Sequence, residues 1–302
     1  MNLKAYGEKA DGAVEQIKTK TLELESLLSV TDEKSEVFAL NSGKTVSPSG
    51  DVYKIIKESA ELSELTGGAL DITIYPVLKA WGFTTQSYRI PSQTELDGLL
   101  KSVGTENISL GESELYLKNN AQIDLGATAK GYLADRTVEI LGENKVSSAL
   151  LNLGGTIVAH GEKPGGAEWK IGVADPENSS EYFGYLSLTD KIAATSGGYE
   201  RYFVGDDGET YIHIIDPKTG RPVKNGITSV TVISDSGITC DALSTALFVS
   251  GTEKAEELWK KSDKSFEFII LTDDKNLFIT EGAADGFKLA EGQNDIILNI
   301  IR

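Results

Sequence analysis

The sequence predicts an α+β fold, in which helices and strands are largely segregated along the chain. Apolar residues recur at steps of three and four over much of the first third, which is the period of an amphipathic helix. After residue 104 the pattern changes to short runs rich in Val, Ile, Leu, Tyr and Thr, separated by Gly, Asn and Asp. Helical patterns interrupt these runs only near residues 128–143, 240–250 and 252–262, which disfavours a doubly wound fold.

Three helices are predicted in the first third. An apolar stripe indicates the first over about residues 12–29; its members are Val14, Ile17, Thr21, Leu24 and Leu28. The second runs near residues 50–66 and ends before Gly67-Gly68, where a helix C-terminus needs a left-handed residue. The third covers residues 91–104, because Ser92 and Glu95 have the spacing of a capping box.

The strands expected after these helices are short. They are ISL at 108–110, LYLK at 115–118, LLNLGGTIVAHG at 150–161, YFGYLSL at 182–188 and SVTVIS at 229–234. Because no repeat or low-complexity linker divides the chain, we expect one domain over residues 1–302.

Composition excludes several classes of function. The 29 Lys and Arg residues are outnumbered by 46 Asp and Glu, and the formal charge of −17 disfavours nucleic-acid binding. The apolar runs, such as residues 266–271, are far shorter than the roughly 20 residues that a membrane-spanning helix needs. Cys240 is the single cysteine, so neither an internal disulfide nor a thiolate metal cluster is expected.

The segment TCDALSTALFVSG at 239–251 carries the first candidate site. Its apolar spacing and closing Gly251 predict a helix, so Asp241 and Thr245 share one face. A carboxylate and a hydroxyl in this arrangement suit a hard cation such as Mg²⁺, which often takes further oxygen ligands from a phosphate substrate. The alternative is an ordinary surface or capping pair.

A second candidate is the run IDLGATAKGY at 123–132. A strand is expected to end at Leu125, and a helix to begin with Lys130 in its first turns. Free N–H groups at a helix N-terminus together with a lysine make an anion site. The alternative is a routine turn with an exposed lysine. Neither GxxxxGK[ST] nor GxGxxG occurs in the chain.

Two further motifs have both functional and structural interpretations. In GGALDITIYPVLKAWGF at 67–83, Trp81-Gly82-Phe83 either forms the wall of an aromatic ligand site or packs the core. In ATSGGYERYF at 194–203 and YIHIIDPKTGRPV at 211–223, His213 is expected within an alternating strand. A lone strand histidine is usually structural, but Ser196 and two glycines nearby leave room for a ligand.

Taken together, these motifs resemble the FAD:protein FMN transferases, the ApbE-like flavin transferases. The resemblance rests on IDLGATAKGY, ATSGGY, HIIDPKTGRPV and CDALSTALF in this order, and it extends to residues 27–41 and 67–83. It implies a tunnelling-fold-like α+β architecture, Mg²⁺ dependence and FAD as donor substrate. The implied reaction transfers FMN through a phosphoester to a Thr or Ser of an acceptor protein and releases AMP.

The resemblance also implies roles for individual residues. The metal ligands would be Asp241, Thr245 and the main-chain oxygen of Ala127. His213 would be the general base, assisted by Asp241. The FAD contacts would be Trp81, Gly82, Asp124, Lys130, Ser196 and the backbone of Ile214 and Ile215.

The chain departs from the family pattern at two places. Thr31 stands where many relatives carry an aromatic residue beside the flavin, which raises the alternative of a Mg²⁺-dependent FAD pyrophosphatase that yields FMN and AMP. A flavin-binding lipoprotein without catalysis is the other alternative. The opening residues 1–7 resemble the second half of the family's first strand, so we expect the natural start to be missing. Family membership would then imply an extracytoplasmic protein, tethered to the membrane by a lipid anchor.

Overall fold

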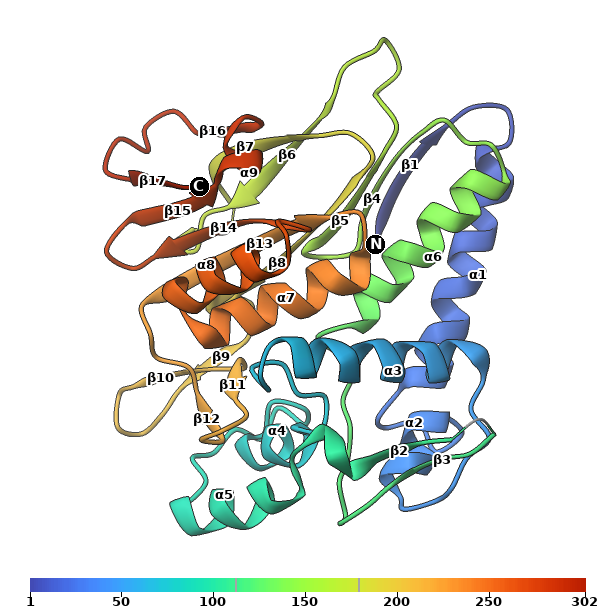
Figure 1. Ribbon diagram of the computed structural model, residues 1–302, viewed down its shortest axis with the longest axis vertical. Coiled ribbons are helices and arrows are strands. Elements are labelled where there is room, and N and C mark those ends of the chain that lie inside the picture. The colour runs from blue at the N-terminus through green and yellow to red at the C-terminus, as the bar shows by residue number, and fades with distance from the viewer. Residues whose placement is uncertain (112, 179) are drawn as a thin grey trace.

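An eight-stranded sheet runs through the upper half of the molecule in the computed structural model (Figure 1), which describes residues 1–302 except 112 and 179. Its strands are antiparallel to their neighbours, apart from the parallel pair β15 and β17. In spatial order they are β1 (Asn2–Tyr6), β4 (Ser148–Asn152), β5 (Thr156–His160), β8 (Lys191–Gly197), β13 (Ile227–Ser234), β14 (Glu267–Thr272), β15 (Asn276–Thr280) and β17 (Ile297–Ile301).

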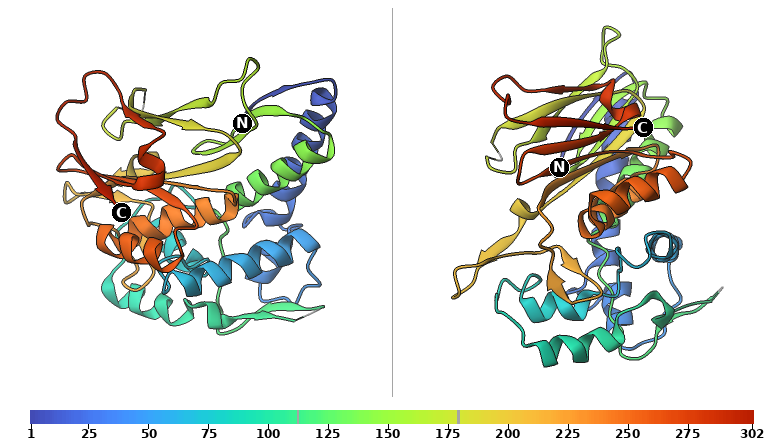
Figure 2. Two further views of the ribbon diagram at one scale, coloured as in Figure 1. Left: turned by 45° about the horizontal axis from the view of Figure 1, so that its top comes forward. Right: turned by 60° about the vertical axis from the view of Figure 1, so that its left-hand side comes forward.

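Each face of this sheet is covered by a different layer (Figure 2). Helices cover one face: α6 (Ala129–Glu143), α7 (Gly237–Ser250) and α8 (Thr252–Lys261). A smaller sheet packs on the other: β6 (Trp169–Ala174), β7 (Tyr182–Leu188) and β16 (Phe287–Leu289). The short α9 (Glu281–Ala284) joins β15 to β16. The predicted α+β class is confirmed.

Helix α7 lies between the large sheet and a second helical layer. Leu243 and Leu247 pack against the sheet, whereas Ala242 and Ala246 pack toward α3 (Gly50–Leu65). Because both sides are covered, the helix is apolar nearly all round, as expected of a buried helix. Its polar Asp241 is therefore held at a defined place in the interior.

The lower half is built from short elements around α3 and the C-terminal end of α1 (Ala10–Leu28), whose first turns pack beside α6 in the upper half. Its helices are α2 (Glu36–Asn41), α4 (Tyr75–Trp81) and α5 (Gln93–Leu99). Its two-stranded ribbons are β2 (Ile108–Leu110) with β3 (Leu115–Leu117), β9 (Tyr202–Val204) with β10 (Thr210–Ile212), and β11 (Ile215–Asp216) with β12 (Arg221–Pro222). No helix in the described part of the chain is long and apolar enough to span a bilayer.

Most of the predicted elements are present, with three corrections. The helix expected over 91–104 ends at Leu99 and continues as a 3₁₀ turn over Leu100–Ser102, although Ser92 does cap it. The strand expected before Leu125 is reduced to a single bridge, between Ile74 and Gln122. The neighbouring segment cannot continue the pairing, because it enters helix α4 at Tyr75. His213 lies in the bend between β10 and β11, since the chain leaves one ribbon there and enters the next.

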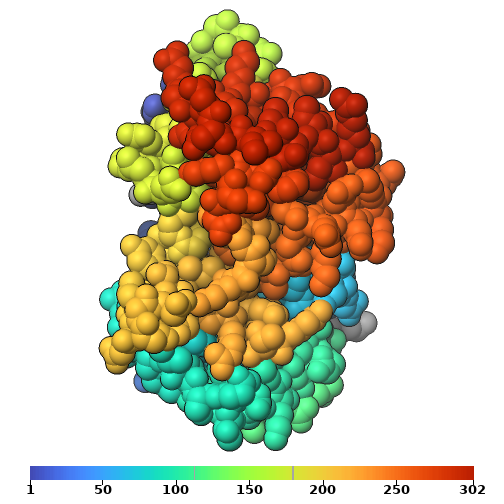
Figure 3. Space-filling model, turned by 90° about the vertical axis from the view of Figure 1, so that its left-hand side faces the viewer, coloured from blue at the N-terminus to red at the C-terminus, as the bar shows by residue number. Residues whose placement is uncertain are grey.

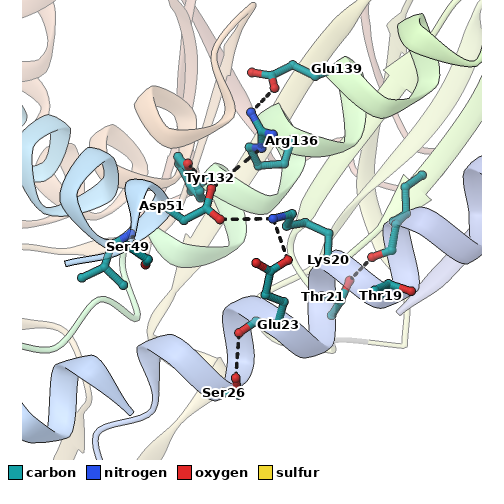
Figure 4. Close-up of polar contacts among 12 residues, drawn as sticks. Thr19, Lys20, Thr21, Glu23, Ser26, Ser49, Asp51, Tyr132, Arg136 and Glu139 are labelled. Carbon is teal, nitrogen blue, oxygen red and sulfur yellow. Dashed lines mark hydrogen bonds and ion pairs between the residues drawn. The ribbon is translucent and has the colours of Figure 1, made fainter. Parts of the chain in front are cut away.

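A partly buried polar network fixes α6 against the two neighbouring helices (Figure 4). The Asp51 carboxylate of α3 accepts hydrogen bonds from the Tyr132 hydroxyl at 2.7 Å and from Lys20 Nζ of α1 at 3.1 Å. Burial alone would raise the pKa of Asp51, but these two donors lower it below its usual value. Asp51 therefore remains a carboxylate that ties α1, α3 and α6 together.

Candidate active site

One cavity in the described structure collects residues from all four sequence motifs. The 123–132 run contributes Asp124, Ala127 and Lys130, and α7 contributes Asp241 and Thr245. Ser196 comes from the end of β8, His213 and Ile214 from the segment between two ribbons, and Ile215 from the start of β11. Segments far apart in the chain thus meet between the large sheet and the lower half.

The crossing of α6 and α7 sets the core of the site. A Cβ atom on Gly131 would lie 2.2 Å from the Gly237 main-chain oxygen, so only glycine allows the helices to approach this closely. The Gly131 N–H donates to Asp241 Oδ2 at 3.0 Å, at the start of α6. The Gly237 and Ile238 N–H groups, at the start of α7, donate to the Asp135 carboxylate at 2.5 and 2.9 Å.

Asp241 is a buried carboxylate that lines the cavity. Its residue is 4 % exposed, and Lys130 Nζ lies 3.7 Å from Oδ1, beyond hydrogen-bond distance. Burial raises the pKa of Asp241, whereas the Lys130 ammonium and the Gly131 N–H act in the opposite direction. A further positive charge at Oδ1 would stabilise the carboxylate, which is the condition that a cation meets.

The oxygen atoms around Asp241 suit a hard cation. Thr245 follows one helical turn later, its hydroxyl lies 3.2 Å from Ser196 Oγ, and Ala127 lines the same cavity. No group of three or more His, Cys, Asp and Glu side chains gathers for a metal within the described ranges. A site here would therefore need main-chain, hydroxyl and substrate oxygens beside one carboxylate, as Mg²⁺ accepts in phosphate-handling enzymes.

His213 presents a neutral imidazole to the cavity. Burial, helped by the nearby cations Arg201 and Lys130, lowers its pKa to about 4, so the ring is uncharged at neutral pH. Nδ1 lies 3.1 Å from the Arg201 main-chain oxygen, which can only accept a hydrogen bond. Nδ1 therefore carries the proton, and Nε2 keeps the lone pair that a general base needs.

Three charged cavity residues are not among the site residues predicted from the sequence. Glu200 and Arg201 follow the glycine pair of the 194–203 motif, and Asp71 lies in the 67–83 motif. Burial raises the pKa of Asp71, Glu200 and the predicted Asp124 above their usual values. The signal that could have found them is their position inside motifs already singled out.

Three predicted flavin contacts lie away from the cavity wall. Trp81 is fully buried, donates from Nε1 to the Gly220 main-chain oxygen at 2.8 Å, and packs against Tyr211, so core packing describes it. Gly82 takes φ +84° at the end of α4, and the next residue, Phe83, is the one that lines the cavity. Thr31 lies on the exposed loop after α1, where its N–H donates to Ser29.

Comparison with known proteins identifies the family of this chain. The sequence matches the ApbE family over residues 1–270. The chain belongs to this family. A relative from Haemophilus influenzae, named FAD:protein FMN transferase, is 32% identical over 290 residues, which cover 92% of this chain and 83% of the relative. Another protein of that name, from Treponema pallidum, is 30% identical over 301 residues, covering 93% of this chain and 83% of the relative.

Solved ApbE structures share the fold. The ApbE protein of Thermotoga maritima has a TM-score of 0.82 and 33% identity, covering 96% of this chain and 92% of that one. The Pseudomonas stutzeri flavinyl transferase ApbE, in its apo form, has a TM-score of 0.77 and 28% identity, covering 88% and 84%. The family resemblance drawn from the motifs and the class of enzyme, a transferase, are confirmed.

Proposed function

We propose that this chain transfers the FMN moiety of FAD, with Mg²⁺, to a Thr or Ser hydroxyl of an acceptor protein and releases AMP. Its relatives carry the name FAD:protein FMN transferase, which supports the donor and the use of a protein acceptor. The observation that carries the chemistry is the neutral His213, which lines the cavity that also holds Asp241 and Lys130.

We propose that the FAD pyrophosphate binds at the start of α6. Lys130 supplies a positive charge that is still 39% exposed, and the helix N-terminus adds partial positive charge. Both features favour the two adjacent phosphates of FAD over a neutral ligand. The apolar part of the cavity, which includes Ile74, Leu78 and Phe83, lies on the side proposed for the isoalloxazine ring.

In the proposed reaction the acceptor hydroxyl oxygen attacks the FMN-side phosphorus. His213 Nε2 takes the hydroxyl proton as the new oxygen–phosphorus bond forms. The bond from this phosphorus to the bridging oxygen breaks, and AMP departs with that oxygen. Lys130 holds the pyrophosphate in place, and Arg201 keeps the imidazole oriented through its main-chain oxygen.

Asp241, Thr245 and the main-chain oxygen of Ala127 are the residues proposed to hold Mg²⁺. When bound, the ion would neutralise negative charge on the phosphate oxygens. The fit rests on Asp241, whose buried carboxylate lines the cavity and whose Oδ1 lies beyond hydrogen-bond distance of Lys130.

Mass spectrometry of an acceptor domain incubated with the protein, FAD and Mg²⁺ tests the proposal. We expect one added FMN on a Thr or Ser, and AMP in equal amount. The addition should disappear with EDTA or in Asp241→Ala. An unmodified acceptor with intact FAD would overturn the proposal, and FMN with AMP released equally fast without acceptor would identify a pyrophosphatase instead.

A further inference from the structure

An exposed apolar surface borders the cavity beside the β9–β10 ribbon. Four large exposed side chains flank the free edge of β9, and together we call them the β9 shelf. Tyr88 and Ile90, exposed by 41% and 42%, lie on the ribbon face that carries Phe203, and Tyr202 and Val204, exposed by 53% and 61%, point from the opposite face. Figure 3 faces this side of the molecule, where the ribbon lies next to the segment around residue 90. Exposed apolar side chains on both faces of a free strand edge are typical of a binding surface.

The outer edge of β9 is free to accept another strand. In the described structure β9 pairs with β10 alone, in the register Phe203 to Tyr211. The flanking bonds, from His213 N to Arg201 O and from Gly205 N to Glu209 O, place the odd-numbered residues of β9 in this ladder. Main-chain groups alternate sides along a strand, so those of Tyr202 and Val204 point away from β10.

Aromatic rings form a floor along this free edge. Phe203 stacks on Tyr211 at 5.2 Å on one side and on Tyr88 at 5.0 Å on the other, so the row of rings extends past β9. The Ile90 side chain comes near Gly205, at the end of the strand. A chain laid against β9 would therefore bury Tyr88 and Ile90 beneath it.

The shelf is continuous with the catalytic cavity. Glu200 and Arg201 line the cavity, and β9 begins at the next residue, Tyr202. Phe83 lines the cavity as well and contacts both Tyr88 and Phe203, at 5.7 and 5.8 Å between ring centroids. Since a strand advances about 3.3 Å per residue, a segment paired with Tyr202 reaches the cavity within one or two residues.

We propose that the β9 shelf binds an extended segment of the acceptor protein, which adds as a strand to the free edge of β9. This inference rests on the proposed function. Main-chain hydrogen bonds to Tyr202 and Val204 hold the segment, and apolar residues beside its Thr or Ser cover Tyr88 and Ile90. The hydroxyl residue continues past Tyr202 into the cavity, toward His213 Nε2.

Two proline substitutions on opposite edges of the ribbon test the proposal. Val204→Pro removes an N–H from the free edge of β9, where proline is tolerated. Thr210→Pro is the matched control, because Thr210 lies directly opposite Val204 and its N–H points off the other edge. Ile90→Asp, at an exposed position, removes part of the floor without altering the ribbon backbone.

The measurement is the acceptor KM at saturating FAD, using an acceptor domain that the wild-type chain flavinylates. We expect Val204→Pro and Ile90→Asp to raise this KM roughly fivefold or more, and Thr210→Pro to change it less than about twofold. The Kd for FAD, measured by flavin fluorescence, should stay within about twofold in all three variants.

The outcomes separate the two proposals. If the wild-type chain transfers FMN and both shelf variants keep its acceptor KM, the shelf is not the docking surface. If Thr210→Pro raises the KM as much as Val204→Pro, the effect comes from ribbon distortion and the inference fails. If the wild-type chain modifies no acceptor, the proposed function itself fails, and the shelf proposal with it.

Discussion

Asp135 and Asp241 lie on adjacent helices, and each accepts hydrogen bonds from the first turn of the other's helix. Asp135 of α6 accepts from Gly237 and Ile238 of α7, and Asp241 of α7 accepts from Gly131 of α6. Negative charge at a helix N-terminus is stabilised by the helix dipole, so both carboxylates favour the same alignment. This alignment brings Lys130 beside Asp241 in the cavity.

Replacing Asp135 with asparagine should weaken the site from a distance. The amide would keep one acceptor oxygen and turn an NH₂ group toward an N–H, so we expect a loss of about 1–2 kcal/mol in stability. If Asp241 holds Mg²⁺ as proposed, metal affinity and transfer rate should fall about 10- to 100-fold because Asp241 loses its alignment. Asp235→Asn is the control, since Asp235 precedes the same helix but is 80% exposed. Equal effects of the two changes on metal affinity by calorimetry would contradict this role.

The close approach of Gly131 and Gly237 predicts that a larger residue at position 131 destabilises the protein. Gly131→Ala places a methyl group against the Gly237 main-chain oxygen, so the helices must separate, at a cost of about 1–3 kcal/mol. Gly142→Ala, in the same helix, meets no atom within 4 Å and should instead stabilise the protein by up to about 1 kcal/mol. Thermal unfolding of the two variants measures both the expected loss and the expected gain in stability. If Gly131→Ala were as stable as Gly142→Ala, the α6–α7 contact would have room for a methyl group and the prediction would be wrong.

The presence of Asp241 and Thr245 on one face of a helix could be predicted from the sequence, because α7 is mostly apolar and these two residues are one helical turn apart. The residues that contact this helix start could not be predicted from the sequence. Gly237 and Asp135 are 102 residues apart, and no local pattern says that two helix starts will cross there. Trp81 shows a different limit: it adjoins Phe83 in one motif, yet the turn at Gly82 sends the indole into the core and the next ring to the cavity.

The bend at His213 was missed for a related reason. The alternation of YIHII fits one strand, but the chain divides it between two ribbons, β10 and β11. Which ribbon each half joins depends on β9 and β12, and these contacts are made only in the folded protein. The bend matters, because it places His213 opposite the Arg201 main-chain oxygen that fixes its tautomer.

Replacing His213 with glutamine should remove the proposed general base while leaving FAD binding intact. Glutamine can donate to the Arg201 oxygen but cannot take a proton, so we expect transfer to slow about 10²- to 10⁴-fold. Single-turnover transfer at saturating FAD measures this step. In the wild type, burial lowers the pKa of His213 to about 4. Protonation of His213 should therefore slow the reaction only when the pH nears 4. An acid limb near pH 6.5 that is absent from the variant would contradict a buried, neutral base.

The same pKa predicts how stability depends on pH. Burial lowers the pKa of His213 from 6.5 to about 4 in the folded protein, so between these values the unfolded chain binds a proton that the folded chain does not. Stability from this group therefore falls as the pH drops from 6.5 toward 4. The buried carboxylates Asp124 and Asp241 have raised pKa values and therefore add stability as the pH falls. Because His213→Gln keeps both carboxylates, the difference between wild type and variant reports His213 alone. Urea unfolding at pH 7 and pH 4.5 should show a larger loss in the wild type than in His213→Gln; equal losses would mean that the imidazole is open to solvent.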